Sequence, residues 1–311
     1  SFIFEGKLPI PSDTIIGLYH PFRDLYAKEY PNGIPFKNFL ITDSVRQQYP
    51  WRELSIDLLQ RGELPLWNPY SMAGYPLLAN QQSAPLYPIN LLFFVLPFSF
   101  AWSILIALQP LLGGAFIYLY LRNLYLNNWA SLLGAFVFAF SGFSIAWMEW
   151  GTILHSAVWL PLILLSIDKV FSILSIKRHS GERSESRINP FVRFWTSQND
   201  KIFVFWTLVF IFSLTSSFLA GHLQTFFYVF LVTLGYLLVR WWQYGKERKM
   251  LLLFVVCCLL FVAITSIQWI PTLQLIGESA REIDRADWQQ PGWFIPWQHL
   301  IQFVAPDFFG N

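Results

Sequence analysis

Long apolar stretches alternate with polar segments along this chain. Six stretches are long enough to cross a hydrocarbon core of about 30 Å, which takes about 20 helical residues. They cover approximately residues 99–121, 129–148, 153–176, 202–220, 222–242 and 250–271. A seventh stretch, from Pro85 to Pro97, is too short to cross alone, so we expect it to be interfacial or re-entrant. The pattern predicts an all-α fold, a polytopic transmembrane helical bundle of about six spans.

The polar segments divide the rest of the chain. Residues 1–84 precede a transmembrane region at 85–272, and residues 273–311 follow it. Inside that region, residues 177–201 are hydrophilic and lack an apolar period, which predicts a flexible loop. The chain starts at a serine and stops abruptly after Asn311, so we expect it to be a fragment of a longer protein.

Lysine and arginine gather in alternate connections, and this sets the expected orientation. The loop 177–201 has six of them, the connection 240–249 has four, and Arg122 follows the first span. The tail 273–311 has only two, against five acidic residues. Because basic connections stay in the cytoplasm, we expect residues 1–84 and 273–311 to lie outside a cell membrane, as large extracytoplasmic segments.

The composition fits lipid as the solvent. Hydrophobic residues make up 55% of the chain and charged residues 13%, about half the share that is usual in soluble domains. Aromatic residues make up 19%, which fits repeated crossings of the bilayer interface. A net charge of +2 is too small to indicate nucleic acid. Cys257 and Cys258 are adjacent in an apolar run, where we interpret them as helix fillers rather than a disulfide or metal site.

The outer N-terminal segment has a helical part and an irregular part. Residues 43–60 read as a helix with an imperfect apolar face, which could lie along the membrane surface. Asp43 or Ser44 is the expected cap, and Gly62 is expected to end the helix. Residues 62–80 combine prolines and glycines with aromatic residues that favour burial, which predicts an ordered, functional loop packed on the mouth of the helices.

Several motifs resemble the YfhO-like family of bacterial membrane proteins. They are Gly62 to Tyr70 (GELPLWNPY), Ala73 to Asn80 (AGYPLLAN), Tyr87 to Leu92 (YPINLL), Ala220 to Thr225 (AGHLQT), Gln268 to Pro271 with Ser279-Ala280-Arg281, and Pro306 to Asn311. These motifs run in family order from about residue 40 to the end. The resemblance implies a GT-C type membrane glycosyltransferase of the cell envelope. It would transfer a sugar from a polyprenyl-phosphate donor to a cell-surface polymer or glycolipid on the extracytoplasmic face.

The resemblance also implies an acidic residue at the site. GT-C enzymes place an essential carboxylate in the first outer loop, where it deprotonates the acceptor hydroxyl or holds a metal or the acceptor. Asp43, Asp13 and Asp24 are the candidates, and Asp43 is favoured because the residues after it resemble the family pattern. The alternatives are a helix cap for Asp43 and solvated turns for Asp13 and Asp24. Glu149, at the outer end of the second span, could join Asp43 across the cavity mouth.

Positively charged side chains are the candidates for the donor phosphate, whose leaving group needs its charge offset. Arg46, Arg52, Arg281 and Arg285 are expected to face outward and to grip a phosphate with paired hydrogen bonds. Arg281 also matches the Ser-x-Arg of the family. Contact with lipid head groups is the alternative for all four.

Histidines near the outer helix ends are further candidates. His222 and Gln224 lie in a family motif and could bind a phosphate or a sugar hydroxyl, although such a histidine often only bonds a neighbouring helix. For His155 too, the alternatives are binding of a ligand and a hydrogen bond to a neighbouring helix. Near the inner end of the third span, Asp168 is expected to be snorkelling or paired. Some GT-C relatives use a divalent metal, but no cluster of ligands in the sequence supports one.

Two other classes of function remain open from the sequence. A non-catalytic transporter or lipid-linked sugar flippase is the alternative to a transferase. Transporters usually have charged or broken helices at mid-depth, and these spans have almost no charge there. A purely structural partner in an assembly is the third hypothesis. No phosphate-binding glycine loop, zinc spacing or nucleophile elbow is present in the sequence.

Overall fold

The computed structural model describes residues 7–33, 41–181, 190–246, 248–279, 297–303, 305 and 308. Over this part, six helical segments are long and apolar enough to cross a membrane, as the sequence predicts. They are Phe98–Asn123, Asn128–Trp150, Ile153–Ser175, Asp200–Leu219, Leu223–Gln243 and Arg248–Gly277. The protein is therefore a mostly helical membrane protein, and the short stretch from Pro85 to Pro97 does not form a further span.

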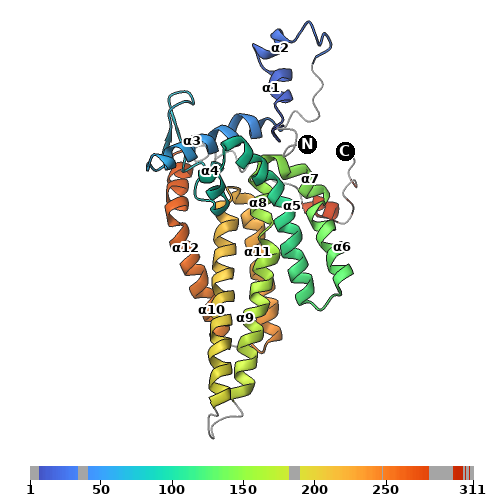
Figure 1. The fold of residues 1–311 in the computed structure, drawn as a ribbon, viewed down its shortest axis with the longest axis vertical. Helices are drawn as coiled ribbons and strands as arrows, with labels where there is room; N and C mark the ends of the chain where they lie inside the picture. The colour runs from blue at the N-terminus through green and yellow to red at the C-terminus, as the bar shows by residue number, and fades with distance from the viewer. Residues whose placement is uncertain are drawn as a thin grey trace.

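The first polar segment folds into short elements at one end of the bundle, which we name the cap end (Figure 1). These elements are α1 (Asp13–Leu18), α2 (Phe22–Leu25), the π-helix η2 (Ser44–Gln48), α3 (Tyr49–Gln60), the antiparallel strands β1 (Trp67–Asn68) and β2 (Tyr75–Pro76), the 3-10 helix η3 (Pro88–Leu91), and α4 (Leu92–Val95). Figure 1 shows α1 and α2 protruding from this end, whereas α3 lies across the tops of the long helices.

Long helices form the body of the molecule. They are α5 (Phe98–Asn123), α6 (Asn128–Ala139), α7 (Gly142–Trp147) with η4 (Met148–Trp150), α8 (Ile153–Ala157), α9 (Leu160–Gly181), α10 (Pro190–Leu219), α11 (Leu223–Gln243) and α12 (Arg248–Gly277), followed by η6 (Trp297–Phe303). In the spans that hold α9 and α10, 56% and 50% of the most apolar stretch is buried inside the protein, against 22 to 28% in the other four spans. These two helices therefore form the centre, where α9 packs on α5 and α11, and α10 packs on α12.

The helix ends that flank the three basic connections lie at one end of the bundle. α5, α9 and α11 end, and α6, α10 and α12 begin, opposite the cap end in Figure 1, at what we name the loop end. This arrangement agrees with the alternation of charged connections in the sequence. The side of the membrane on which each end lies stays a prediction from those charges.

Several predicted boundaries are wrong. The second apolar stretch is broken after α6, because the side chain of Ser141 accepts a hydrogen bond from the Ser144 N–H and starts α7. The third is broken between α8 and α9. Much of the loop predicted at 177–201 is helical, since α9 continues to Gly181 and α10 begins at Pro190. Finally, α12 continues past Pro271 to Gly277 instead of ending near 271.

The helix predicted at residues 43–60 is present as η2 and α3, and its polar face is more deeply buried than its apolar face. Its apolar residues are only partly buried, apart from Ile56, and a polar stripe is buried instead. The buried polar residues, spaced three or four apart on one face, are Ser44, Gln48, Arg52 and Ser55. Neither Asp43 nor Ser44 caps the helix with its side chain. Gly62 ends it as expected, with the left-handed φ of +77° that glycine tolerates.

The loop after α3 is ordered, as predicted, and two long-range hydrogen bonds hold it to the bundle. Gln268 of α12 donates from Nε2 to the Leu78 carbonyl oxygen at 2.6 Å. Gln81 of the loop donates from Nε2 to the Phe218 carbonyl oxygen at 3.3 Å. Leu78 and Gln81 are buried. The prediction that the aromatic residues of this loop are buried is wrong for Trp67, whose exposed fraction is 51%.

A buried ion pair joins α9 and α11 near the loop end. Asp168 accepts hydrogen bonds from Nε of Arg240 at 2.7 Å and from Nη2 at 3.0 Å. Tyr236 and Asn123 donate to the same carboxylate at 2.7 and 3.0 Å. The prediction that Asp168 is paired is therefore confirmed. Its carboxylate connects three of the long helices, because Asp168 lies in α9, Asn123 in α5, and Tyr236 and Arg240 in α11.

Candidate functional site

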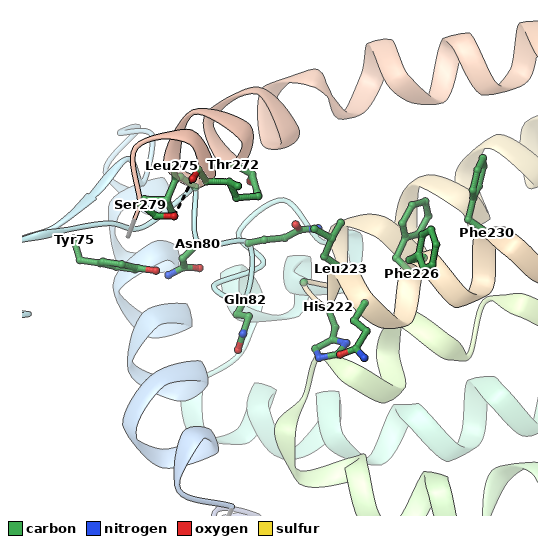
Figure 2. Close-up of a pocket in the computed structure, with 16 residues that line it drawn as sticks. Tyr75, Asn80, Gln82, His222, Leu223, Phe226, Phe230, Thr272, Leu275 and Ser279 are labelled. Atoms are coloured by element: carbon green, nitrogen blue, oxygen red, sulfur yellow. Dashed lines mark hydrogen bonds between the residues drawn. The ribbon is translucent and has the colours of Figure 1, made fainter. Parts of the chain in front are cut away.

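The cap end contains a cavity of about 870 Å³, which we name the cap-end cavity. Three segments far apart in the sequence line it: β2 with the loop after it, the α10–α11 turn with the first turns of α11, and the end of α12 with the residues just after it. Its lining residues are Tyr75, Ala79, Asn80, Gln81, Gln82, Gly221, His222, Leu223, Gln224, Phe226, Phe227, Phe230, Thr272, Leu275, Ile276 and Ser279. Figure 2 shows the polar loop residues at one end of this cavity and Phe226 and Phe230 at the other, along α11.

A second, smaller cavity adjoins the same turn. This apolar groove has a volume of about 480 Å³ and lies between α7, α8 and α11. Its lining residues are Phe143, Trp147, Ile153, Ala157, Leu160, His222, Gln224, Thr225, Tyr228, Val229 and Val232. His222 and Gln224 line both cavities, so the start of α11 forms a wall common to the cap-end cavity and the apolar groove.

Gly221 allows the α10–α11 turn to approach the loop. Its φ of +97° lies in the left-handed region, which side chains other than hydrogen disfavour. A Cβ atom there would be 2.9 Å from the Gln81 carbonyl oxygen and 2.9 Å from the Ala84 Cβ atom. Both contacts involve atoms that cannot rotate away. The close packing of these two segments, and with it this wall of the cavity, therefore requires glycine.

The first prediction concerns this glycine. Gly221→Ala is expected to lower the free energy of unfolding by about 1–3 kcal/mol, because it adds both backbone strain and a backbone clash. Gly235→Ala is the matched control on α11, where a Cβ atom would meet nothing within 4 Å and φ is ordinary. Alanine there is expected to be neutral or to stabilise by about 0.5–1 kcal/mol. Denaturant titration in detergent measures both, and equal effects would contradict the interpretation.

His222 caps α11. Its Nδ1 accepts a hydrogen bond from the Thr225 backbone N–H at 3.2 Å and lies 2.7 Å from the Thr225 hydroxyl. Burial lowers the pKa of His222, so the ring is neutral at pH 7. Gln224 donates from Nε2 to the Tyr228 hydroxyl at 3.1 Å. The structure thus places both predicted binding residues on the cavity walls.

Amide side chains provide half of the polar residues that line the cap-end cavity: Asn80, Gln81, Gln82 and Gln224. Gln82 accepts a hydrogen bond from Gln48 of η2 at 2.9 Å, which ties the cavity wall to the helix that follows Asp43. The Gln81 Oε1 and Asn80 Nδ2 atoms are buried without a hydrogen-bond partner. The wall therefore offers an unpaired acceptor and an unpaired donor.

Asp43 is not among the residues that line this cavity. It is half-buried at the start of η2, and its carboxylate makes no capping hydrogen bond, so the cap interpretation of this residue is wrong. It precedes Gln48 by five residues, which is no more than about 8 Å along a helix axis. The η2 segment packs on η4, which contains Glu149, and Ile41 is buried with Trp150. The segments that carry the two favoured acids are therefore neighbours.

The other two acidic candidates lie in the protruding arm. Asp13 is the first residue of α1, and Asp24 in α2 pairs with His20, with both side chains more than 60% exposed. Neither aspartate lines the cap-end cavity or the apolar groove. Arg46 holds this arm to η2, because its Nη1 donates to the Tyr19 hydroxyl at 2.7 Å and its guanidinium lies over the same ring.

The predicted arginines have different positions. Arg281 and Arg285 lie outside the described residues. Arg52 is fully buried, so the prediction that it faces outward is wrong. Its guanidinium lies 5.7 Å from the Trp102 ring centroid, with Nη1 3.4 Å from Asn90 Oδ1. Burial lowers the pKa of Arg52 to about 10, which leaves it a cation beneath α3 at neutral pH.

His155 is a structural histidine. Its Nδ1 lies 2.8 Å from the Tyr87 hydroxyl, which accepts a hydrogen bond from Trp159 Nε1 at 3.2 Å. Its Nε2 lies 2.9 Å from the Leu105 carbonyl oxygen, which can only accept. Nε2 therefore carries the proton, the Tyr87 hydroxyl donates to Nδ1, and both ring nitrogens are satisfied. The ring has no hydrogen-bonding capacity left for a ligand.

Some cavity residues escaped the sequence analysis. Gln81 and Gln82 directly follow the motif that ends at Asn80, but nothing in their spacing marks them as cavity residues. Thr272 and Ser279 come to the site only because α12 continues beyond Pro271. Among the described residues, no group of three or more histidine, cysteine or acidic side chains could hold a metal ion.

The chain was also compared with known proteins. Searches against models of protein families, curated proteins and solved structures gave no match. The resemblance to the YfhO-like family accordingly stays an expectation from the sequence motifs, and the site is interpreted below from its own geometry.

Proposed function

We propose that the chain is part of a GT-C type membrane transferase. It would move a sugar from a polyprenyl-phosphate donor to a cell-surface polymer or glycolipid on the extracytoplasmic face. The observation that carries this proposal is the pair of cavities that share a wall at His222 and Gln224. A donor of this class has a hydroxyl-rich head and a long apolar chain, and each cavity matches one of these parts.

The cap-end cavity suits the sugar. Its volume of about 870 Å³ lies within the range of about 300–1,000 Å³ that is usual for small-molecule sites. Sugar hydroxyls both donate and accept hydrogen bonds, and the wall offers the unpaired Asn80 Nδ2 donor and the unpaired Gln81 Oε1 acceptor. The apolar groove, with aromatic and aliphatic walls beside the lipid-exposed face of α11, suits the first isoprene units of the chain.

The charge distribution supports reaction on the outer side. The segments that line the cap-end cavity lie at the end of the bundle opposite the places where α5, α9 and α11 end (Figure 1). Since basic connections stay in the cytoplasm, this end would face outward. Asp43 and Glu149, on the neighbouring segments η2 and η4, would then lie on the acceptor side of the cavity. There a carboxylate would remove the proton of the acceptor hydroxyl as the sugar–phosphate bond breaks.

A transfer assay tests the proposal. The protein is placed in nanodiscs with polyprenyl-phosphate glucose carrying a radiolabelled sugar, and with a glycolipid acceptor. Labelled acceptor is the expected product. Release of label only to water, or no reaction with any of a panel of sugars on the same lipid carrier, would count against a transferase.

The second prediction concerns the apolar groove. Val232→Trp is expected to fill the groove and to raise KM for a long-chain donor about ten-fold, with kcat little changed, because it removes binding of the unreactive chain. Val239→Trp is the matched control on the same face of α11, with a side chain 52% exposed against 48% for Val232. The Val239 variant should behave like the wild type, and equal effects of the two variants would show that the groove does not hold the chain.

A lipid-linked sugar flippase is the second candidate, because a protein that carries a lipid-linked sugar across the membrane would also bind its sugar and its apolar chain in two such cavities. An assay in detergent distinguishes the two functions, because there is no bilayer across which a flippase could move its substrate. A transferase still labels the acceptor there. A flippase does not, and it instead moves labelled donor across liposome membranes without an acceptor.

A further inference from the structure

Three hydrogen-bond donors lie together at the wall common to the two cavities. The first turn of α11 uses its Thr225 N–H for His222 Nδ1 and its Phe226 N–H for the His222 carbonyl oxygen. Within the described part of the chain, the N–H groups of Leu223 and Gln224 and the Nε2 atom of His222 have no partner. Unpaired N–H groups are normal at a helix start, but these belong to residues that line the cap-end cavity.

The cap fixes the tautomer of His222. A backbone N–H can only donate, so the Nδ1 atom that receives it carries a lone pair. In a neutral imidazole the proton is then on Nε2. Because Nδ1 is turned back to the helix, the Nε2–H points away from the first turn of α11. His222 is thereby a fixed hydrogen-bond donor and has no free nitrogen with which to act as a general base.

The surroundings favour an anion as the acceptor. The positive end of the dipole of a 21-residue helix lies at this point, and helix starts with unpaired N–H groups bind phosphate readily. No carboxylate is among the described residues that line either cavity, so nothing there competes for the donors. An independent observation also indicates a polar ligand. Gln81, only 4% exposed, has its Oε1 atom unpaired in the wall of the same cavity.

We propose that the start of α11 is a phosphate subsite. The His222 Nε2–H and the N–H groups of Leu223 and Gln224 bind phosphate oxygens of an amphiphile. The apolar chain of that amphiphile lies in the groove, and its hydroxyl-bearing head reaches Gln81. The identity of the amphiphile rests on the proposed function, since an isoprenyl phosphate and a membrane phospholipid share this chemistry. His222 would stabilise the phosphate leaving group and would not take the proton of the acceptor.

His222→Asn separates the donor role from the cap role. Asparagine is a good N-cap and keeps an acceptor for the Thr225 N–H, but it lacks the Nε2–H. We expect an unchanged melting temperature and about ten-fold weaker binding of farnesyl phosphate in nanodiscs, as for the loss of one hydrogen bond to a charged group. Binding of farnesol, which has the chain and no phosphate, should not change. Equal weakening of both ligands, or of neither, would overturn the subsite.

Nitrogen-15 NMR of histidine-labelled protein tests the tautomer without any ligand. The expected spectrum has a bare Nδ1 and a protonated Nε2 for His222, identified by loss of its signals in His222→Asn. A proton on Nδ1 at neutral pH would overturn the assignment of His222 as the donor.

Phosphatidic acid as a third ligand distinguishes the sources. Tighter binding of farnesyl phosphate, weakened by His222→Asn, supports both the subsite and the proposed donor class. Tighter binding of phosphatidic acid with the same dependence on His222 supports the subsite and counts against the proposed function. If the transfer assay fails while farnesyl phosphate still binds in a way that depends on His222, the result supports the subsite and counts against the proposed function.

Discussion

Asp43→Asn is expected to lower sugar transfer about 100-fold or more, the usual share of a general base in a transfer reaction. Asparagine has the shape of aspartate but cannot accept the proton. The substitution should not disturb the fold, because the Asp43 carboxylate has no hydrogen-bond or ion-pair partner within the described part of the chain and does not cap η2. Initial rates of transfer, measured with protein of equal melting temperature, provide the test.

Asp57→Asn is a matched control for this experiment. Asp57 lies in α3 and pairs with Arg61 on the exposed surface, at 2.6 Å. Its replacement should leave the transfer rate within about two-fold of the wild type. Asp13→Asn and Asp24→Asn should lower the rate less than Asp43→Asn, because both residues lie in the protruding arm. A wild-type rate in Asp43→Asn would remove Asp43 from the site and leave Glu149 as the next acid to examine.

Asp168→Ala is expected to lower the free energy of unfolding by about 2–3 kcal/mol. Removing one partner of a fully buried ion pair commonly costs about 3–5 kcal/mol, and the cost here is smaller because Arg240 is 23% exposed and keeps its hydrogen bond to Gln243. The Asp168 side chain is only 7% exposed, and its carboxylate binds Arg240, Tyr236 and Asn123. Four hydrogen bonds are therefore lost together with the charge.

A double-mutant cycle with Arg240→Gln measures the pair itself. We expect the double variant to be more stable than the sum of the two single effects predicts, by about 1–3 kcal/mol, because contacting residues are not independent. Asp57→Ala is the control on the exposed pair with Arg61 and should cost no more than about 1 kcal/mol. Additive effects of Asp168 and Arg240 would contradict a stabilising pair.

The six spans were predictable because the bilayer imposes a local rule. A chain in lipid must satisfy its backbone within each helix and keep about 20 apolar residues in a row, and both demands are visible in sequence. The breaks within two of the spans were not visible. At Ser141 an apolar stretch simply continues, and a side-chain hydrogen bond to the Ser144 N–H decides that a new helix starts there.

The helix after Asp43 shows a limit of periodicity. The sequence predicts an apolar face that could lie along the membrane surface, whereas Gln48, Arg52 and Ser55 are buried within the protein. The reason is the chemistry of the opposing surface. Gln82 and Asn90 lie there and pair with Gln48 and Arg52. A pattern within one helix carries no information on whether its partner is apolar or polar.

The sequence by itself predicted the six spans, the alternation of the basic connections along the chain, and His222 and Gln224 as candidate residues. Only the tertiary structure decided that these two residues line both the cap-end cavity and the apolar groove. The contacts that build the cavity connect residues 137 and 190 positions apart, Gln81 with Phe218 and Gln268 with Leu78. Such contacts arise from packing among helices, and the local pattern of apolar and polar residues does not encode which loops will meet.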